Sequence, residues 1–510
     1  MQNFRALDDG VSFEQVFTGH TAEGALRSPS DIESNQFESE PRLSPNTGVL
    51  EVSAARWNIG PGKPPVRWLL QSTATEYALS PPASDYDLVG AIKAGVESWN
   101  TAFGFEALRF EVGTPGDSFA DDDKNVILFD PDPTNAYAFA NWRTNPNTGE
   151  IRGASVYFNA IWVLLGHLTM GDDPGTAPTL PIFPALEAPR PALFAWGPLR
   201  TSPLCVLTPA ALEAEGPLVA ALAPAPAEPL TKKQKVERYL AHVMAHEIGH
   251  TLGLRHNFKG SLQPPSSSIM DYLGDSASIA LPAPGAYDID ALRFLYDLSP
   301  NEPTQAFCTD EGLAGEALCA RFDAGALPLT DTLVPAYVTF LDDFLAGASG
   351  TLPNTSLNRV LAYVRAGGSS ETKLAAWDGA FGQLRGPLAP GREPGPVDAA
   401  TRHVIFRLLL SPPEVRGDVS ANPSFDPLLT PRLVDDVRAA LVNQNGALSF
   451  ATRRLAVDAL EIMQIDAAYV ALVGARAELV ALLPSLTGDE AALTGELIAR
   501  IDRAVDPYFE

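Results

Sequence analysis

The residues with the clearest chemical meaning run from His246 to His256 and read HEIGHTLGLRH. On a helix, His246 and His250 project from one face, so both can bind one Zn²⁺. Glu247 is placed beside the first ligand to act as general base on a metal-bound water. Gly253 allows a left-handed turn that ends the helix and returns His256 as third ligand. Three histidines leave a fourth position for water, as in a catalytic zinc site.

A buried amphipathic helix with incidental histidines is the alternative interpretation. Four of the seven histidines fall between His242 and His256, and Glu247 and Gly253 stand where the metal chemistry needs them. This completeness favours the zinc site. His242 lies one turn before His246 but lacks an adjacent glutamate, so we interpret it as a supporting or purely structural residue.

A second motif, SIMDY at residues 268–272, follows His256 after a short polar loop. With it, the sequence resembles the metzincin clan of zinc endopeptidases, in which a tight turn, the Met-turn, carries a methionine beneath the zinc. The resemblance implies that Met270 forms an apolar floor under the imidazoles. It also implies that Tyr272 can approach the zinc and stabilise an oxyanion, as in astacins and serralysins. For Met270 alone, ordinary core packing is the alternative.

Within that clan the chain is similar to a group of bacterial secreted zinc-dependent metalloproteases, over about residues 60–330. Segments 246–258, 268–272 and 308–323 carry the similarity. It implies a bacterial protein that is secreted or held in the cell envelope. The first residues lack the basic and apolar regions of a signal peptide, so either the protein stays inside the cell or this is a mature or trimmed form. The resemblance favours the second.

Apolar periodicity and the resemblance together predict an α+β catalytic domain followed by a mostly α-helical domain. The strands are expected at residues 66–71, 108–112, 125–129 and 151–159, and a helix at 87–103. The resemblance implies a twisted mixed sheet with an antiparallel edge strand, a backing helix and an active-site helix. It also implies that 151–159 is the edge strand, along which an extended protein or peptide substrate binds.

Four parts are expected along the chain. Residues 1–48 are interpreted as an extended arm or pro-segment remnant, 49–300 as the catalytic domain, 301–329 as a cysteine-containing linker and 330–510 as the helical domain. Residues 163–231 are rich in Pro and Ala and are interpreted as an insertion, which either walls the cleft or is an inert surface excursion. A closing helix is expected over 287–296, with Asp288 or Asp290 capping it or bracing the preceding turn.

Charge and composition limit the partners. The net charge of −26 argues against binding to nucleic acid or anionic membranes. No run of about 18 apolar residues is present, so no transmembrane segment is expected. The sequence leaves the oligomeric state open. The acidic residues 121–123 and 310–311 lack the spacing of known calcium loops, so we interpret them as solvated, with structural Ca²⁺ as the alternative.

The chain has three cysteines, Cys205, Cys308 and Cys319. Cys308 and Cys319 bracket a short Gly/Glu-rich loop and can close a small disulfide in an oxidising compartment. Two free thiols are the alternative. Cys205 is interpreted as a buried thiol.

These observations predict a metalloendopeptidase with one catalytic zinc, Glu247 as general base and Tyr272 as oxyanion donor. Two alternatives remain. One is a zinc amidase that acts on cell-wall peptides. The other is a catalytically inactive protease-fold binding protein, against which the intact Glu247 argues.

Overall fold

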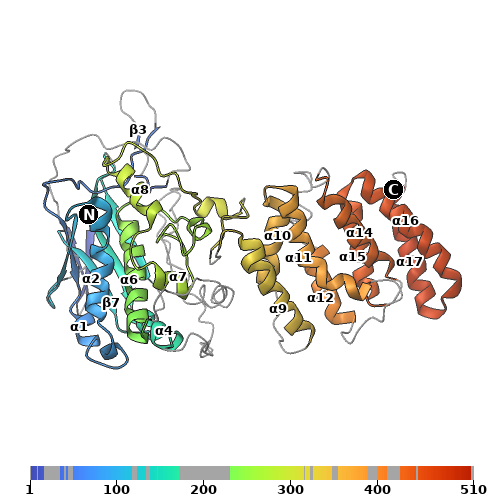
Figure 1. Cartoon of the computed structure of the whole chain (residues 1–510), viewed down its shortest axis with the longest axis horizontal. Helices are drawn as coiled ribbons and strands as arrows, with labels where there is room; N and C mark the ends of the chain where they lie inside the picture. Colours follow the sequence, from blue (N-terminus) through green and yellow to red (C-terminus); the bar gives the residue numbers. More distant parts are fainter. Residues whose placement is uncertain are drawn as a thin grey trace. The chain divides into compact units, whose positions relative to one another are not determined.

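The computed structural model (Figure 1) describes residues 2–7, 10–15, 35–39, 42–43, 50–117, 123–133, 138–145, 148–171, 230–314, 316–321, 325–346, 354–388, 399–410, 426–443 and 446–506. The chain divides into two compact units. The first is Met1–Gly312 with Cys319–Ala326, and the second is Leu313–Leu318 with Leu327–Glu510. The first combines a five-stranded sheet with helices and the second is built from helices, so the predicted fold class is confirmed.

A mixed sheet with the strand order β6-β5-β7-β9-β8 forms the frame of the first unit. Its strands are β5 (Val66–Leu70), β6 (Leu108–Val112), β7 (Asn125–Asp130), β8 (Ala138–Thr144) and β9 (Ile151–Asn159). β8 runs antiparallel to β9, and the other pairings are parallel. Trp68, Ile127, Val156 and Phe158 are fully buried. Their aromatic and β-branched side chains suit a covered sheet.

The outermost strands of this sheet are β6 and β8, so the prediction that residues 151–159 form an edge strand is wrong. β9 lies between β7 and β8, and β8 is itself antiparallel. β8 contains Ala, Asn, Arg and Thr and shows weaker apolar patterning than β9. Pattern strength reports burial and does not reveal which strand lies outermost.

Short strands precede the main sheet. They are β1 (Gln2–Leu7) paired with β2 (Gly10–Gln15), and β3 (Arg42–Leu43) paired with β4 (Leu50–Glu51). The sequence interpretation of residues 1–48 as one extended arm did not include these pairings.

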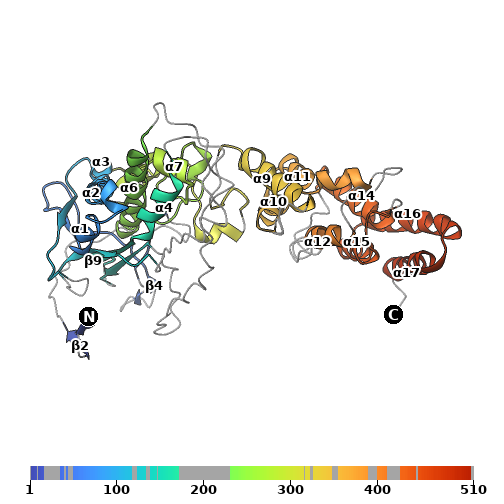
Figure 2. The same ribbon diagram turned by 90° about the horizontal axis from the view of Figure 1, so that it is seen from below.

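Helices lie on one face of the sheet (Figure 2). They are α1 (Thr73–Tyr77), α2 (Leu88–Glu97), α3 (Trp99–Phe103), α4 (Ile161–Thr169), α6 (Lys232–Thr251), α7 (Asp275–Ala280) and α8 (Ala286–Leu295), with 3-10 turns at Ala83–Asp85, Gly260–Leu262 and Asp310–Ala314. The helix predicted at 87–103 is divided at Ser98 into α2 and α3. A Cβ on Gly95 of α2 would lie 2.7 Å from Ala241 O, so only glycine allows this approach to α6. Trp99 Nε1 donates to Ala245 O at 2.9 Å.

Residues 163–169, the first part of the predicted insertion at 163–231, belong to helix α4. α4 packs on α6, where the Trp162 and Tyr239 rings lie 6.2 Å apart. Residues 172–229 lie outside the described part of the chain. The prediction of a cleft wall or surface excursion falls there, as does Cys205.

The second unit is a series of helices whose contacts are mainly with near neighbours in the sequence. They are a π-helical turn at Leu329–Leu333, α9 (Val334–Leu345), α10 (Asn354–Ala366), α11 (Ser370–Leu388), α12 (Ala399–Leu410), α14 (Leu429–Val442), α15 (Phe450–Met463), α16 (Asp466–Leu482), a 3-10 turn at Leu483–Ser485 and α17 (Gly488–Val505). Buried Asp436 accepts hydrogen bonds from Trp377 at 2.9 Å and from Arg385 at 2.8 Å. This contact ties α11 to α14.

One segment of this unit, Asp466–Ser485, is long and apolar enough to cross a membrane by length and composition alone. It carries charged residues that pair with neighbouring helices. Arg476 pairs with Asp502 of α17, and Glu478 pairs with Arg438 of α14. These ion pairs suit a helix that packs within a helical unit.

Candidate metal centre

Helix α6 carries two of the three candidate ligands. Thr231 caps its start, because the Thr231 hydroxyl accepts from Gln234 N at 3.3 Å and the Gln234 side chain accepts from Thr231 N at 3.0 Å. Every residue from 239 to 251 is buried. The helix therefore holds His246 and His250 inside the protein.

A left-handed turn ends the helix and returns the chain to the same place. Gly253 has φ of +96°, and a Cβ there would lie 2.1 Å from Ala55 O. Leu254 N donates to Gly249 O at 3.1 Å, which closes the turn. The chain then delivers His256 opposite the two helical histidines, as the sequence predicts.

His246, His250 and His256 form a compact, buried cluster. One ring nitrogen from each lies within 4.8 Å of the others, and the Nε2 atoms of His246 and His250 are 3.2 Å apart. Each Nδ1 faces an acceptor. That of His246 lies 2.7 Å from Ile269 O, that of His250 lies 2.9 Å from Leu254 O, and that of His256 lies 2.8 Å from Asp310 Oδ2. Carbonyl and carboxylate oxygens only accept, so each Nδ1 carries the proton and each Nε2 carries the lone pair.

This donor set fits zinc. Metal-binding histidines commonly donate their second ring N–H to a carboxylate or a backbone carbonyl, and all three do so here. Burial lowers the pKa of His250 to about 3 and holds the pKa of His246 and His256 below the ordinary value. The charges of neighbouring histidines add to the effect at His246 and His250. Neutral imidazole is the form that binds metal.

Glu247 is fully buried beside this cluster. Among the described residues, neither of its carboxylate oxygens has a hydrogen-bond partner. Burial raises the pKa of Glu247 well above its ordinary value. An unsatisfied buried carboxyl is costly, and such groups concentrate at functional sites. Its position suits a group that exchanges protons with a water near the metal.

The segment 268–272 lies against α6. Met270 is fully buried, and a Cβ on Gly249 would lie 2.4 Å from its sulfur. Gly249 stands immediately before His250, so the methionine packs under the helical part of the site.

Asp288 braces this segment and caps helix α8. It accepts hydrogen bonds from Ser268 Oγ at 2.6 Å, Ile269 N at 2.6 Å and Gly285 N at 2.7 Å. The sequence predicts that Asp288 or Asp290 caps the helix or braces the preceding turn, and Asp288 does both. Asp290 instead accepts from Gln305 at 3.0 Å.

Tyr272 lies beside two of the histidines. Its ring centroid is 4.8 Å from that of His256 and 5.7 Å from that of His246. The Arg321 guanidinium lies 5.3 Å from the Tyr272 ring centroid and 5.1 Å from that of Phe258. Aromatic and cationic packing therefore holds the Tyr272 ring at the edge of the site.

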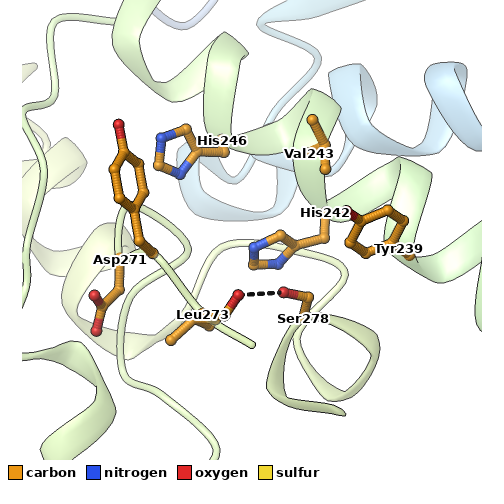
Figure 3. A pocket seen from close by; sticks show the side chains of 8 residues that line it. Tyr239, His242, Val243, His246, Asp271, Leu273 and Ser278 are labelled. Atoms are coloured by element: carbon orange, nitrogen blue, oxygen red, sulfur yellow. Dashed lines mark hydrogen bonds between the residues drawn. The ribbon is translucent and has the colours of Figure 1, made fainter. Parts of the chain in front are cut away.

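A small pocket adjoins His246, and its lining includes His242, Tyr272, Leu273 and Ser278. His242 and His246 reach from α6 toward the loop that carries Leu273 (Figure 3). His242 Nδ1 donates to Leu281 O at 2.7 Å, and burial lowers its pKa to about 4. His242 lines this pocket and stays outside the three-histidine cluster.

Residues 35–39 also reach the site, although the sequence interpretation placed them in the N-terminal arm. Phe37 N donates to Gly253 O, and Ala55 N donates to Phe37 O, both at 2.7 Å. The Phe37 ring centroid lies 4.5 Å from that of Trp142 and 5.8 Å from that of His250. This segment links the turn after α6 to edge strand β8.

One residue near His256, Asp310, was misread from the sequence. Asp310 was interpreted as part of a solvated acidic loop, but it accepts from His256 and from Arg321, each at 2.8 Å. Burial alone would raise the pKa of Asp310, yet His256 and Arg321 outweigh burial and hold the pKa well below its usual range. Cys308 and Cys319, on either side of Asp310, form the disulfide that the sequence predicts.

Residues 229–307 match a family model described as Met-zincin. The match spans α6, the turn to His256, the 268–272 segment and α8. No curated protein and no solved structure shows a match to the chain. The segment that carries the three histidines is therefore similar to the Met-zincins, and this match together with the histidine cluster supports a metalloprotease-like zinc-binding domain.

Proposed function

We propose that the protein is a zinc-dependent endopeptidase that hydrolyses peptide bonds in protein substrates. The observation that supports this most strongly is the buried, unpartnered Glu247 carboxylate beside three convergent histidines. A buried carboxyl group without hydrogen bonds destabilises the fold. Neither a purely structural zinc site nor an inactive binding protein requires such a group.

In this proposal, His246, His250 and His256 would hold a zinc ion, which would supply a Lewis acid for the scissile carbonyl and for a water. Glu247 accepts a proton from the attacking water and delivers it to the leaving amine. Tyr272 donates from its hydroxyl to the oxygen that gains negative charge. Met270 packs against α6 and keeps the helical histidines in place. The reaction needs no covalent enzyme intermediate.

Edge strand β8 supports the choice of an extended peptide as substrate. Among the described strands β8 pairs only with β9, so its other edge can pair with an incoming chain. The Cys308–Cys319 disulfide supports an oxidising compartment, so we propose a secreted or cell-envelope location in a bacterium.

The deciding experiment offers the protein an unfolded protein, a quenched-fluorescent peptide library and purified cell-wall peptides. Products are identified by mass spectrometry, with and without chelator. An endopeptidase cleaves internal bonds of the first two, loses activity on chelation and regains it with zinc. Cleavage confined to cell-wall peptides would favour the zinc amidase, and binding without cleavage would favour the inactive binding protein.

A further inference from the structure

The loop that follows the Met-zincin match reaches back to the third histidine. Asp310 Oδ2 lies 2.8 Å from His256 Nδ1, and Asp310 Oδ1 lies 2.8 Å from Arg321 Nη2. The two carboxylate oxygens thus have different partners. One orients the imidazole, and the other is held by a guanidinium.

Backbone contacts keep this loop beside the histidine. Phe258 N donates to Cys308 O at 2.8 Å, and the buried Asn257 side chain donates to Ala306 O at 3.1 Å and accepts from Cys308 N at 3.2 Å. Asn257 N also donates to Met270 O at 3.1 Å. Asn257 therefore joins the loop and the Met270 segment directly after the ligand.

The Cys308–Cys319 disulfide closes the loop that contains Asp310. Asp310 is two residues after the first cysteine and Arg321 is two residues after the second. The cross-link therefore brings the two members of this ion pair together across a separation of 11 residues.

We propose that Asp310 is the positioning residue of the third zinc ligand and that the Cys308–Cys319 disulfide keeps it in place, so that reduction of the disulfide weakens zinc binding. The carboxylate selects the His256 tautomer that presents Nε2 and increases its basicity. The inference rests on the proposed zinc site but not on peptidase activity. His246 and His250 donate to backbone carbonyls, whereas His256 donates to a side chain that a removable cross-link positions.

The test measures zinc affinity by competition with a chromophoric chelator. The variants are Asp310→Asn, which keeps the shape and removes the charge, and Glu311→Gln, which removes a charge from the adjacent, exposed residue. Asp310→Asn should bind zinc about 10–100-fold more weakly, as removal of partners of metal-binding histidines does elsewhere. Glu311→Gln should bind like wild type. Circular dichroism confirms that each variant is folded.

Two further readouts separate positioning from a general structural role. The visible spectrum of the Co²⁺-substituted protein should shift in Asp310→Asn but not in Glu311→Gln. A protein with both Cys308→Ser and Cys319→Ser, and wild type reduced with a phosphine, should each lose zinc affinity. Adding Asp310→Asn to the cysteine variant should weaken zinc binding less than Asp310→Asn does in wild type, because both changes remove the same interaction.

A loss below about tenfold in Asp310→Asn would overturn the role of Asp310, as would an equal loss in Glu311→Gln. Unchanged affinity in the cysteine variant would overturn the role of the disulfide. Zinc binding that follows this pattern in a protein that cleaves no peptide would refute the proposed function and leave this inference standing.

Discussion

The sulfur of Met270 lies directly against Gly249, so closely that a Cβ on the glycine would be 2.4 Å from it. The same Cβ would lie 2.7 Å from Trp99 Cζ2. Gly249 stands between Glu247 and His250 on helix α6. A glycine is therefore required where the helix, the methionine segment and α3 meet.

Gly249→Ala should destabilise the protein by about 1–3 kcal/mol, because the added methyl group overpacks a closed site. It should also weaken zinc binding, since relief of the clash moves α6 or Met270. Gly382→Ala is the matched control, because a Cβ there meets nothing within 4 Å in helix α11. That control should be neutral or stabilising, as alanine favours helix. If thermal unfolding shows the same stability for both variants, the side chains around Gly249 move aside for the added methyl group at little cost.

Substitution of single histidines should show which of them bind the zinc. His256→Ala should lose most bound zinc, because two histidines make a poor zinc site. His242→Ala should retain one zinc per chain, since His242 lies outside the cluster. Elemental analysis after dialysis against a weak chelator measures both. Full zinc content in His256→Ala would remove His256 from the ligand set.

Asp288 links stability to pH. Burial raises its pKa from 3.8 to about 7, against the hydrogen bonds from Ser268, Ile269 and Gly285. The folded protein then keeps a proton that the unfolded chain loses, so this group lowers stability as pH rises from about 4 to about 7 and has no further effect above. Asp288→Asn does not titrate. Its stability relative to wild type should therefore rise with pH over that window.

Chemical denaturation of the zinc-free wild type and Asp288→Asn between about pH 5 and 8 measures this difference. A constant difference across the window would mean that Asp288 is ionised throughout. In that case the three hydrogen bonds would outweigh the cost of burial.

The part of the site that was predicted from sequence is the part that lies on one continuous stretch. His246, Glu247 and His250 share a helix, and Gly253 adopts the left-handed turn that returns His256. Helical periodicity and the special backbone freedom of glycine are local properties, so their consequences can be derived from spacing.

The parts that were missed depend on contacts between distant residues. Asp310 is 54 positions from His256, and no local pattern distinguishes it from exposed Glu311. The useful signal was its place between two cysteines, which implies an ordered loop. Edge strand β8 was missed for a related reason, because strand order is decided by pairing between segments and not by the apolar pattern within one.

Glu247→Gln tests the proposed chemistry most directly. The amide has the shape of the carboxyl but cannot accept a proton, so peptide hydrolysis should fall by about 10²–10⁴-fold or more while zinc content stays at one per chain. Burial raises the pKa of Glu247, so a neutral side chain should leave the zinc-free protein at least as stable as wild type. Met270→Leu, a swap of similar volume, should cost much less activity. Turnover of a quenched peptide with zinc quantified in each variant gives the answer: near-full activity in Glu247→Gln would assign the proton transfer to another group.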